Sequence, residues 1–174
     1  MIQNYSRYKI LQVFFDFPRR NFHMREISRR IKIAQPSVIN HLKSLANQNL
    51  IIKEKIGIYP TFRANREDEL FKIYKKLNLI LRIKQSGFLD YVYDTCLPNS
   101  IILFGSASKG EDIEESDIDI FVQAPERKLN LEKYEKILRR EIDVFFEEDI
   151  NKLNSELKNN IINGTILKGY LKVF

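Results

Sequence analysis

The sequence has 174 residues, 44% of them hydrophobic, and a formal net charge of +6. This length accommodates one or two small domains, the composition excludes a disordered or collagen-like chain, and the single cysteine, Cys96, excludes an intrachain disulfide and a multi-cysteine metal site. No apolar run approaches the ~18 residues of a membrane span, and the N-terminus has no signal-peptide pattern, so we expect no membrane association and a cytoplasmic protein.

Charge is distributed unevenly along the chain. Residues 1–87 contain 18 Lys and Arg against 6 Asp and Glu, a net charge of +12, whereas residues 88–174 contain 11 against 17, a net charge of −6. This asymmetry indicates two domains, of which the basic one binds a polyanion.

The basic half begins with predicted helices and ends in a predicted hairpin. Apolar spacing predicts helices over about residues 5–17 and 24–31, and a third begins at Pro36, whose fixed φ suits a first helical position. The third helix has an apolar stripe and an opposite polar face. Two β-prone segments, 50–55 and 58–63, surround Gly57 at the expected hairpin tip.

This order resembles the winged helix-turn-helix DNA-binding domains of bacteria and archaea over about residues 5–64. We therefore predict a domain at residues 1–64 whose partner is double-stranded DNA. The residues expected to reach base edges from the recognition helix, and then phosphates from the wing, are Ser37, Asn40, His41 and Ser44, and Lys53 and Lys55. The alternative is a winged helix used only for protein–protein contact.

Residues 65–97 are predicted to be linker helices. Asn65 suits the cap of a helix that runs to about Lys84, and a second helix is expected from Phe88 to Cys96. A long amphipathic helix between two domains is typical of a dimer surface, and packing on its own domain explains the pattern equally well.

The acidic half begins with an apolar strand at 101–104 and a turn that contains Gly105 and Gly110. These glycines have the spacing of a phosphate-binding P-loop. Glu111 and Asp112 stand where that motif requires Lys and Ser or Thr, which excludes it. We interpret the acidic residues at 111–115 as a solvated loop.

Carboxylates occupy alternate positions of the predicted strand 116–122. Period-two geometry places Asp117 and Asp119 on one face and the isoleucines between them on the other. Asp143 alternates with apolar residues in a later strand, and antiparallel or neighbouring pairing is expected to bring it beside the first two. Converging carboxylates need a cation, and hard oxygen ligands suit Mg²⁺, so the pattern indicates a two-metal phosphoryl-transfer site.

Gly105-Ser106, ten further residues and Asp117-x-Asp119 resemble the signature of the DNA polymerase β-like nucleotidyltransferase superfamily, and most closely that of prokaryotic minimal nucleotidyltransferases. The resemblance covers about residues 98–174 and implies a small mixed sheet flanked by helices. The expected fold class is therefore α+β, with a winged helix-turn-helix followed by a nucleotidyltransferase domain.

The resemblance implies a role for each residue of the signature. The Gly105-Ser106 pair would hold the β- and γ-phosphates of a nucleoside triphosphate, with Lys109 standing where relatives usually carry Arg. The Asp117-x-Asp119 pair would bind two Mg²⁺ ions and Asp143 one of them, which makes all three carboxylates catalytic. The implied substrate is a nucleoside triphosphate, ATP first, and pyrophosphate leaves.

Three functions compete. In the favoured one, the protein resembles antitoxins that transfer AMP to a tyrosine of a HEPN-type ribonuclease toxin, while the winged helix represses the operon. In the second, a transcription regulator uses the domain only to sense a nucleotide; in the third, the enzyme modifies a small molecule such as an antibiotic. An inactive descendant, or a sheet edge carrying solvated Asp side chains, also explains the carboxylates. No further helical domain follows to grip the substrate, so we expect a partner or a second copy to complete the pocket, and a homodimer.

Overall fold

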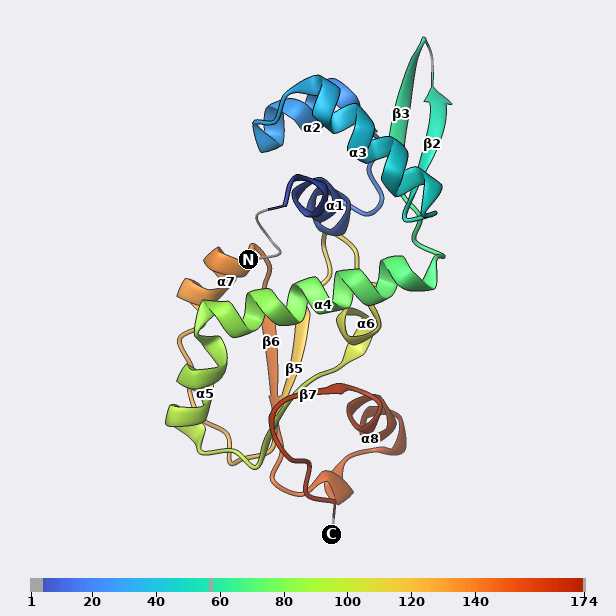
Figure 1. Cartoon of the computed structure of the whole chain (residues 1–174). Helices are drawn as coiled ribbons and strands as arrows, with labels where there is room; N and C mark the ends of the chain where they lie inside the picture. The colour runs from blue at the N-terminus through green and yellow to red at the C-terminus, as the bar shows by residue number, and fades with distance from the viewer. Residues whose placement is uncertain (1–4, 57, 174) are drawn as a thin grey trace. The chain divides into compact units, whose positions relative to one another are not determined.

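A computed structural model describes residues 5–56 and 58–173; Gly57, the predicted hairpin tip, lies outside them. The chain divides into two compact units, residues 1–75 and 76–174. Figure 1 follows the elements of each unit along the chain.

The first unit combines helices with a small antiparallel sheet. The helices are α1 (Ser6–Asp16), α2 (Met24–Ile31) and α3 (Gln35–Asn47), and the strands are β1 (Phe22–His23), β2 (Ile51–Ile56) and β3 (Tyr59–Ala64). The strands lie in the order β1-β3-β2. The predicted helices and hairpin are present. The sequence does not predict the short strand β1, because a two-residue segment has no measurable periodicity.

The turn between α2 and α3 has a local explanation. Lys32 ends α2 in the left-handed region with φ 55°, and the Ser28 hydroxyl donates a 2.6 Å hydrogen bond to the Ile33 carbonyl beyond it. The apolar stripe of α3, Val38, Leu42 and Leu45, is buried in the core of this unit. Its opposite face is therefore left to the surface.

Helix α4 (Glu69–Ser86) begins later than the sequence suggests. The Asp68 carboxylate accepts a 2.8 Å hydrogen bond from the Phe71 amide. Asn65, the expected cap, instead donates its side-chain amide to the Asn49 carbonyl at 2.8 Å. The reason is that Asn65 directly follows β3, where the chain is still tied to the end of α3.

The helices of residues 65–97 belong to the two cores and do not form the separate linker that the sequence predicts. Phe71 of α4 is buried in the core of the first unit. Ile83 of α4, and Phe88, Leu89 and Val92 of α5 (Phe88–Cys96), are buried in the core of the second. The boundary between the units accordingly falls inside α4.

The second unit is built on a mixed sheet, as expected. Its strands are β4 (Ser100–Leu103), β5 (Ile118–Val122), β6 (Ile142–Phe146) and β7 (Thr165–Gly169), in the order β6-β5-β4-β7. The remaining elements are α6 (Gly105–Lys109), α7 (Glu132–Leu138), the 3-10 turn η2 (Ile150–Lys152) and α8 (Ser155–Ile162). β4 pairs antiparallel with β5 and β7, whereas β5 and β6 are parallel.

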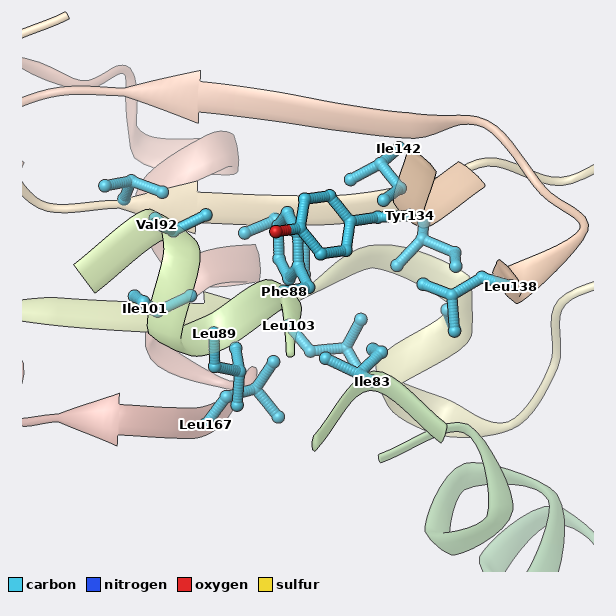
Figure 2. Close-up of a cluster of buried hydrophobic side chains, with 14 of the residues drawn as sticks. Ile83, Phe88, Leu89, Val92, Ile101, Leu103, Tyr134, Leu138, Ile142 and Leu167 are labelled. Atoms are coloured by element: carbon cyan, nitrogen blue, oxygen red, sulfur yellow. The ribbon is translucent and has the colours of Figure 1, made fainter. Parts of the chain in front are cut away.

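Each face of this sheet has its own apolar layer. On one face, Ile101, Leu103 and Ile142 pack with α5 and with Tyr134 and Leu138 of α7, as Figure 2 shows. On the other face, the alternate residues Ile102 and Phe121 pack with Ile150 and with Ile161 of α8. Because successive strand residues point to opposite faces, Asp119 shares the face of Phe121.

Candidate functional site

The turn after β4 brings Gly105 directly against Asp119. Phe104 donates its amide to the Asp119 carbonyl at 3.0 Å, and Gly105 then begins α6 with φ +67°. A β-carbon added at Gly105 would lie 2.1 Å from Oδ2 of Asp119. Glycine is required here for two reasons, the backbone conformation and the close approach of the carboxylate.

Asp119 and Asp143 are neighbours across two parallel strands. They are register partners in the β5–β6 ladder, so their side chains project from the same face. The sequence left the direction of pairing open, and the structure has the parallel arrangement because α7 provides the crossover between these strands.

Asp117 lies just outside the strand in which the sequence placed it. β5 begins at Ile118, and the exposed Asp117 belongs to the preceding loop. The carbonyls of Ser116 and Asp117 accept hydrogen bonds from the Arg140 side chain, at 2.7 and 2.8 Å, so both groups are occupied by a side chain rather than by a strand partner.

The electrostatics of Asp119 reflect all three carboxylates. Burial raises the pKa of Asp119, the charges of Asp143 and Asp117 raise it further, and Arg140 lowers it. The ionised form is thus disfavoured in a place where two more carboxylates stand nearby, a condition that a bound cation relieves.

Within residues 5–56 and 58–173, no group of three or more His, Cys, Asp or Glu side chains is gathered closely enough to hold a metal ion. The donors around Asp119 are all carboxylate oxygens, the chemistry that Mg²⁺ requires. Like charges repel one another until a cation neutralises them, which explains why the three side chains have not converged. The chemistry of the donor set fits Mg²⁺. The predicted metal ligands remain a prediction.

The residues predicted to bind nucleotide lie on the short helix α6. Ser106 is half-buried, and its carbonyl accepts a 3.0 Å hydrogen bond from the Glu111 amide. Lys109 is exposed at the end of the helix, where Gly110 follows with φ +75°. Gly105 therefore lies against Asp119, and Ser106 is the next residue in the backbone. Lys109 lies one helical turn further along α6.

A buried ion pair, which the sequence does not predict, lies next to these residues. Asp112, which we expected in a solvated loop, is 5% exposed and accepts a 2.5 Å hydrogen bond from Arg140. Only Asp112 of the acidic run is buried, among the described residues 111–115. No local pattern could reveal the pair, because its members are far apart in the chain.

The residues predicted to contact DNA lie on the first unit. Asn40 of α3 is exposed, whereas Ser37, His41 and Ser44 are half-buried, and Ser44 accepts a 3.2 Å hydrogen bond from the Gln48 side chain. Lys53 and Lys55 are exposed at alternate positions of β2, on the same side of the hairpin. DNA binding is not tested by this arrangement and stays a prediction.

Comparison with known proteins finds a family match within the second unit. Residues 88–168 match the family model described as "Nucleotidyltransferase domain". The match begins at α5, earlier than the expected boundary at residue 98, and it includes Gly105, Asp119 and Asp143. No curated protein and no solved structure matches the chain. In the part of the chain that the structure describes, no helix has the length and apolar character of a membrane span.

Proposed function

From the nucleotidyltransferase domain that residues 88–168 match, we propose that this protein is a Mg²⁺-dependent enzyme that transfers a nucleoside monophosphate, AMP first, from a nucleoside triphosphate to a hydroxyl of a partner protein. The observation that carries the proposal is the contact of Gly105 with Asp119, beside Asp143. Because Gly105 has no side chain, the Asp119 carboxylate can lie against the backbone of the α6 turn, where we propose that the phosphates bind.

Each site residue has a defined task in this reaction. The backbone and hydroxyl of the Gly105-Ser106 pair, with Lys109, bind the triphosphate, and the Asp117-x-Asp119 pair would hold two Mg²⁺ ions, one of them shared with Asp143. Bound there, the ions would neutralise phosphate charge and favour ionisation of the attacking hydroxyl. The carboxylates thereby orient that hydroxyl toward the α-phosphorus.

We propose a HEPN-type ribonuclease toxin as the acceptor, modified on a tyrosine. The experiment is transfer of label from ATP carrying a radioactive α-phosphate to such a toxin encoded in an adjacent reading frame. Wild type should label the toxin, and Asp143→Asn should bind ATP but transfer no label. Asp94→Asn, which changes an exposed aspartate of α5, is the control and should behave as wild type.

Other outcomes of that experiment select the competing functions. ATP binding without transfer to any acceptor favours a regulator that only senses nucleotide. Label on a small molecule such as an aminoglycoside, and none on protein, favours a small-molecule nucleotidyltransferase. Transfer that survives Asp143→Asn at the wild-type rate contradicts the assigned site.

We propose that the first unit is a winged helix-turn-helix that binds double-stranded DNA. Support comes from the order of α2, turn, α3 and the β2–β3 hairpin, with the polar face of α3 and the exposed Lys53 and Lys55 on the hairpin. The excess of positive charge in residues 1–87 favours a nucleic acid over a protein as the partner.

We also propose a homodimer that forms through α4. Helix α4 carries exposed apolar side chains at intervals of three and four residues: Leu70, Ile73, Tyr74, Leu77 and Leu81. A second copy in antiparallel orientation would place Leu70 opposite Leu81 and Tyr74 opposite Leu77. The same alignment brings Glu67, just before the helix, opposite Lys84, so the surface is complementary to itself in charge as well.

Light scattering after size-exclusion chromatography tests the dimer. Leu77→Glu should convert a dimer into a monomer, because two like charges would meet near the centre of the interface. Ile137→Glu, which changes an equally exposed residue of α7, is the matched control and should leave the mass unchanged. A monomeric wild type contradicts the proposal.

A further inference from the structure

Arg140 lies between α7 and β6, and its guanidinium contacts the loop of residues 111–117. Its Nε donates to the Ser116 carbonyl at 2.7 Å, and its Nη2 donates to the Asp117 carbonyl at 2.8 Å. Its Nη1 donates to Oδ2 of Asp112 at 2.5 Å. The side chains of Arg140 and Asp112 are only 13% and 6% exposed. The guanidinium thus uses all three of its nitrogens on one loop.

The other contacts of this loop connect it to the turn that carries Gly105 and Ser106. The Glu111 amide donates to the Ser106 carbonyl at 3.0 Å, and the Ile113 amide donates to the Ser116 hydroxyl at 3.0 Å. The loop is therefore held at its start by α6 and at its end by Arg140. The hydrogen bonds of Arg140 therefore fix the backbone of the loop at Asp117.

Arg140 also stands at the entrance to the strand that carries Asp143. The Ile118 amide donates to the Glu141 carbonyl at 3.0 Å, and the Ile142 amide donates to the Glu135 carboxylate at 3.1 Å. One side chain consequently connects the residues that precede Asp143 with those that precede Asp119. Its geometry depends on the planar fork of arginine, which lysine does not provide.

We propose that Arg140 is a positioning residue that holds Asp117 next to the Asp119–Asp143 pair, so that the carboxylates can bind divalent cations together. This inference rests on the proposed nucleotidyltransferase function. Arg140 touches neither the nucleotide nor the carboxylate groups of Asp117, Asp119 and Asp143 in the contacts described above. Asp112 is its buried counter-charge, and loss of either partner leaves the other charge uncompensated.

The test is cation binding, measured with Mn²⁺ by electron paramagnetic resonance on the full chain. Outer residues that orient metal ligands contribute about 10- to 100-fold to metal affinity. Arg140→Lys keeps the charge and loses the fork, so we expect Mn²⁺ affinity to fall at least tenfold, with a matching rise in the Mg²⁺ concentration needed for half-maximal transfer. Circular dichroism and thermal unfolding establish that the variant is folded.

Arg63→Lys is the matched control. Arg63 is also an arginine paired with a carboxylate, that of Glu54 at 2.6 Å, but it lies on β3 of the first unit. It should retain wild-type Mn²⁺ affinity. Asp112→Asn is a second, milder variant that keeps an acceptor for Arg140, and it should weaken Mn²⁺ binding less than Arg140→Lys does. If Arg140→Lys does not fold, the Mn²⁺ affinity of Asp112→Asn provides the test.

The outcomes separate this inference from the proposed function. Wild-type Mn²⁺ affinity in folded Arg140→Lys, or in Asp112→Asn if the first variant is unfolded, overturns the role of Arg140 and leaves the enzyme proposal standing. Mn²⁺ binding that depends on Arg140, without transfer to any acceptor, supports the positioning role and overturns the enzyme. A wild-type protein that binds no Mn²⁺ overturns both.

Discussion

Gly105 and Asp119 are in such close contact that any side chain at the glycine would displace the carboxylate. The added β-carbon would lie 2.1 Å from Oδ2 and 3.0 Å from Cγ of Asp119. The backbone of the α6 turn and the first carboxylate of the β5–β6 pair are therefore parts of one site. A change at Gly105 acts on the nucleotide and the cation ligands together.

Gly105→Ala should abolish nucleotide transfer and reduce ATP affinity more than tenfold. Alanine at φ +67° also strains the backbone by about 1–2 kcal/mol. Gly87→Ala is the matched control, because Gly87 has φ +80° and open space where its β-carbon would be. Calorimetric titration with ATP and Mg²⁺ checks binding. Equal ATP affinity in the two variants would contradict the assigned contact.

The raised pKa of Asp119 predicts how stability depends on pH. Its folded-state pKa is raised by burial and by Asp143 and Asp117, so the folded protein favours the protonated form. The stabilisation that protonated Asp119 gives the folded state is complete below the unfolded-state pKa of about 3.9. It is lost as pH rises through the folded-state pKa. Without divalent cations, Asp119→Asn should thus be more stable than wild type at pH 7, and this difference should shrink toward pH 4.

Urea unfolding of both proteins between pH 4 and pH 8 measures this difference in the free energy of unfolding. Asp94→Asn is the control for loss of an exposed carboxylate and should show no such trend. Added Mg²⁺ should stabilise wild type at pH 7 more than Asp119→Asn. If the difference in the free energy of unfolding is independent of pH, the charge of Asp119 does not destabilise the folded protein.

Two kinds of substitution in the first unit should affect DNA binding differently. The double variant Lys53→Ala/Lys55→Ala should bind all duplexes more weakly and reduce the slope of log affinity against log salt by about 2, since two phosphate contacts are lost. Asn40→Ala should instead change which sequence is preferred. Fluorescence anisotropy over a salt series measures both effects.

Lys128→Ala/Lys136→Ala removes the same charge from exposed positions of the second unit and serves as the control. It should leave the salt slope unchanged. Unaltered affinity and preference in both first-unit variants would show that this unit does not bind DNA through α3 and the hairpin.

Thr61→Val should stabilise the protein. Thr61 of β3 is 4% exposed, and its hydroxyl has no hydrogen-bond partner among residues 5–56 and 58–173. A buried polar group without a partner costs about 1–3 kcal/mol, and valine has a similar shape without the hydroxyl. Thr95→Val should have the opposite effect, because the Thr95 hydroxyl donates to the Tyr91 carbonyl at 2.7 Å. Scanning calorimetry of the two variants distinguishes these directions.

The sequence by itself determined the features that depend on local backbone geometry. Alternation along a strand separates Asp119 from its neighbours Ile118 and Ile120, and helical spacing predicts α2 and α3 near their observed bounds. The need for glycine at position 105 also follows from the motif. The family match over residues 88–168 confirms the nucleotidyltransferase domain that this motif indicates.

The tertiary structure decided what depends on contacts between distant segments. The parallel register of Asp119 with Asp143 requires the crossover through α7, and no periodicity in either strand specifies it. Asp112 reads as one more charge in an acidic run until Arg140 meets it in a buried pair. Likewise, Phe71 and Ile83 of α4 are buried in different cores, because burial is a property of the surfaces that meet rather than of the helix alone.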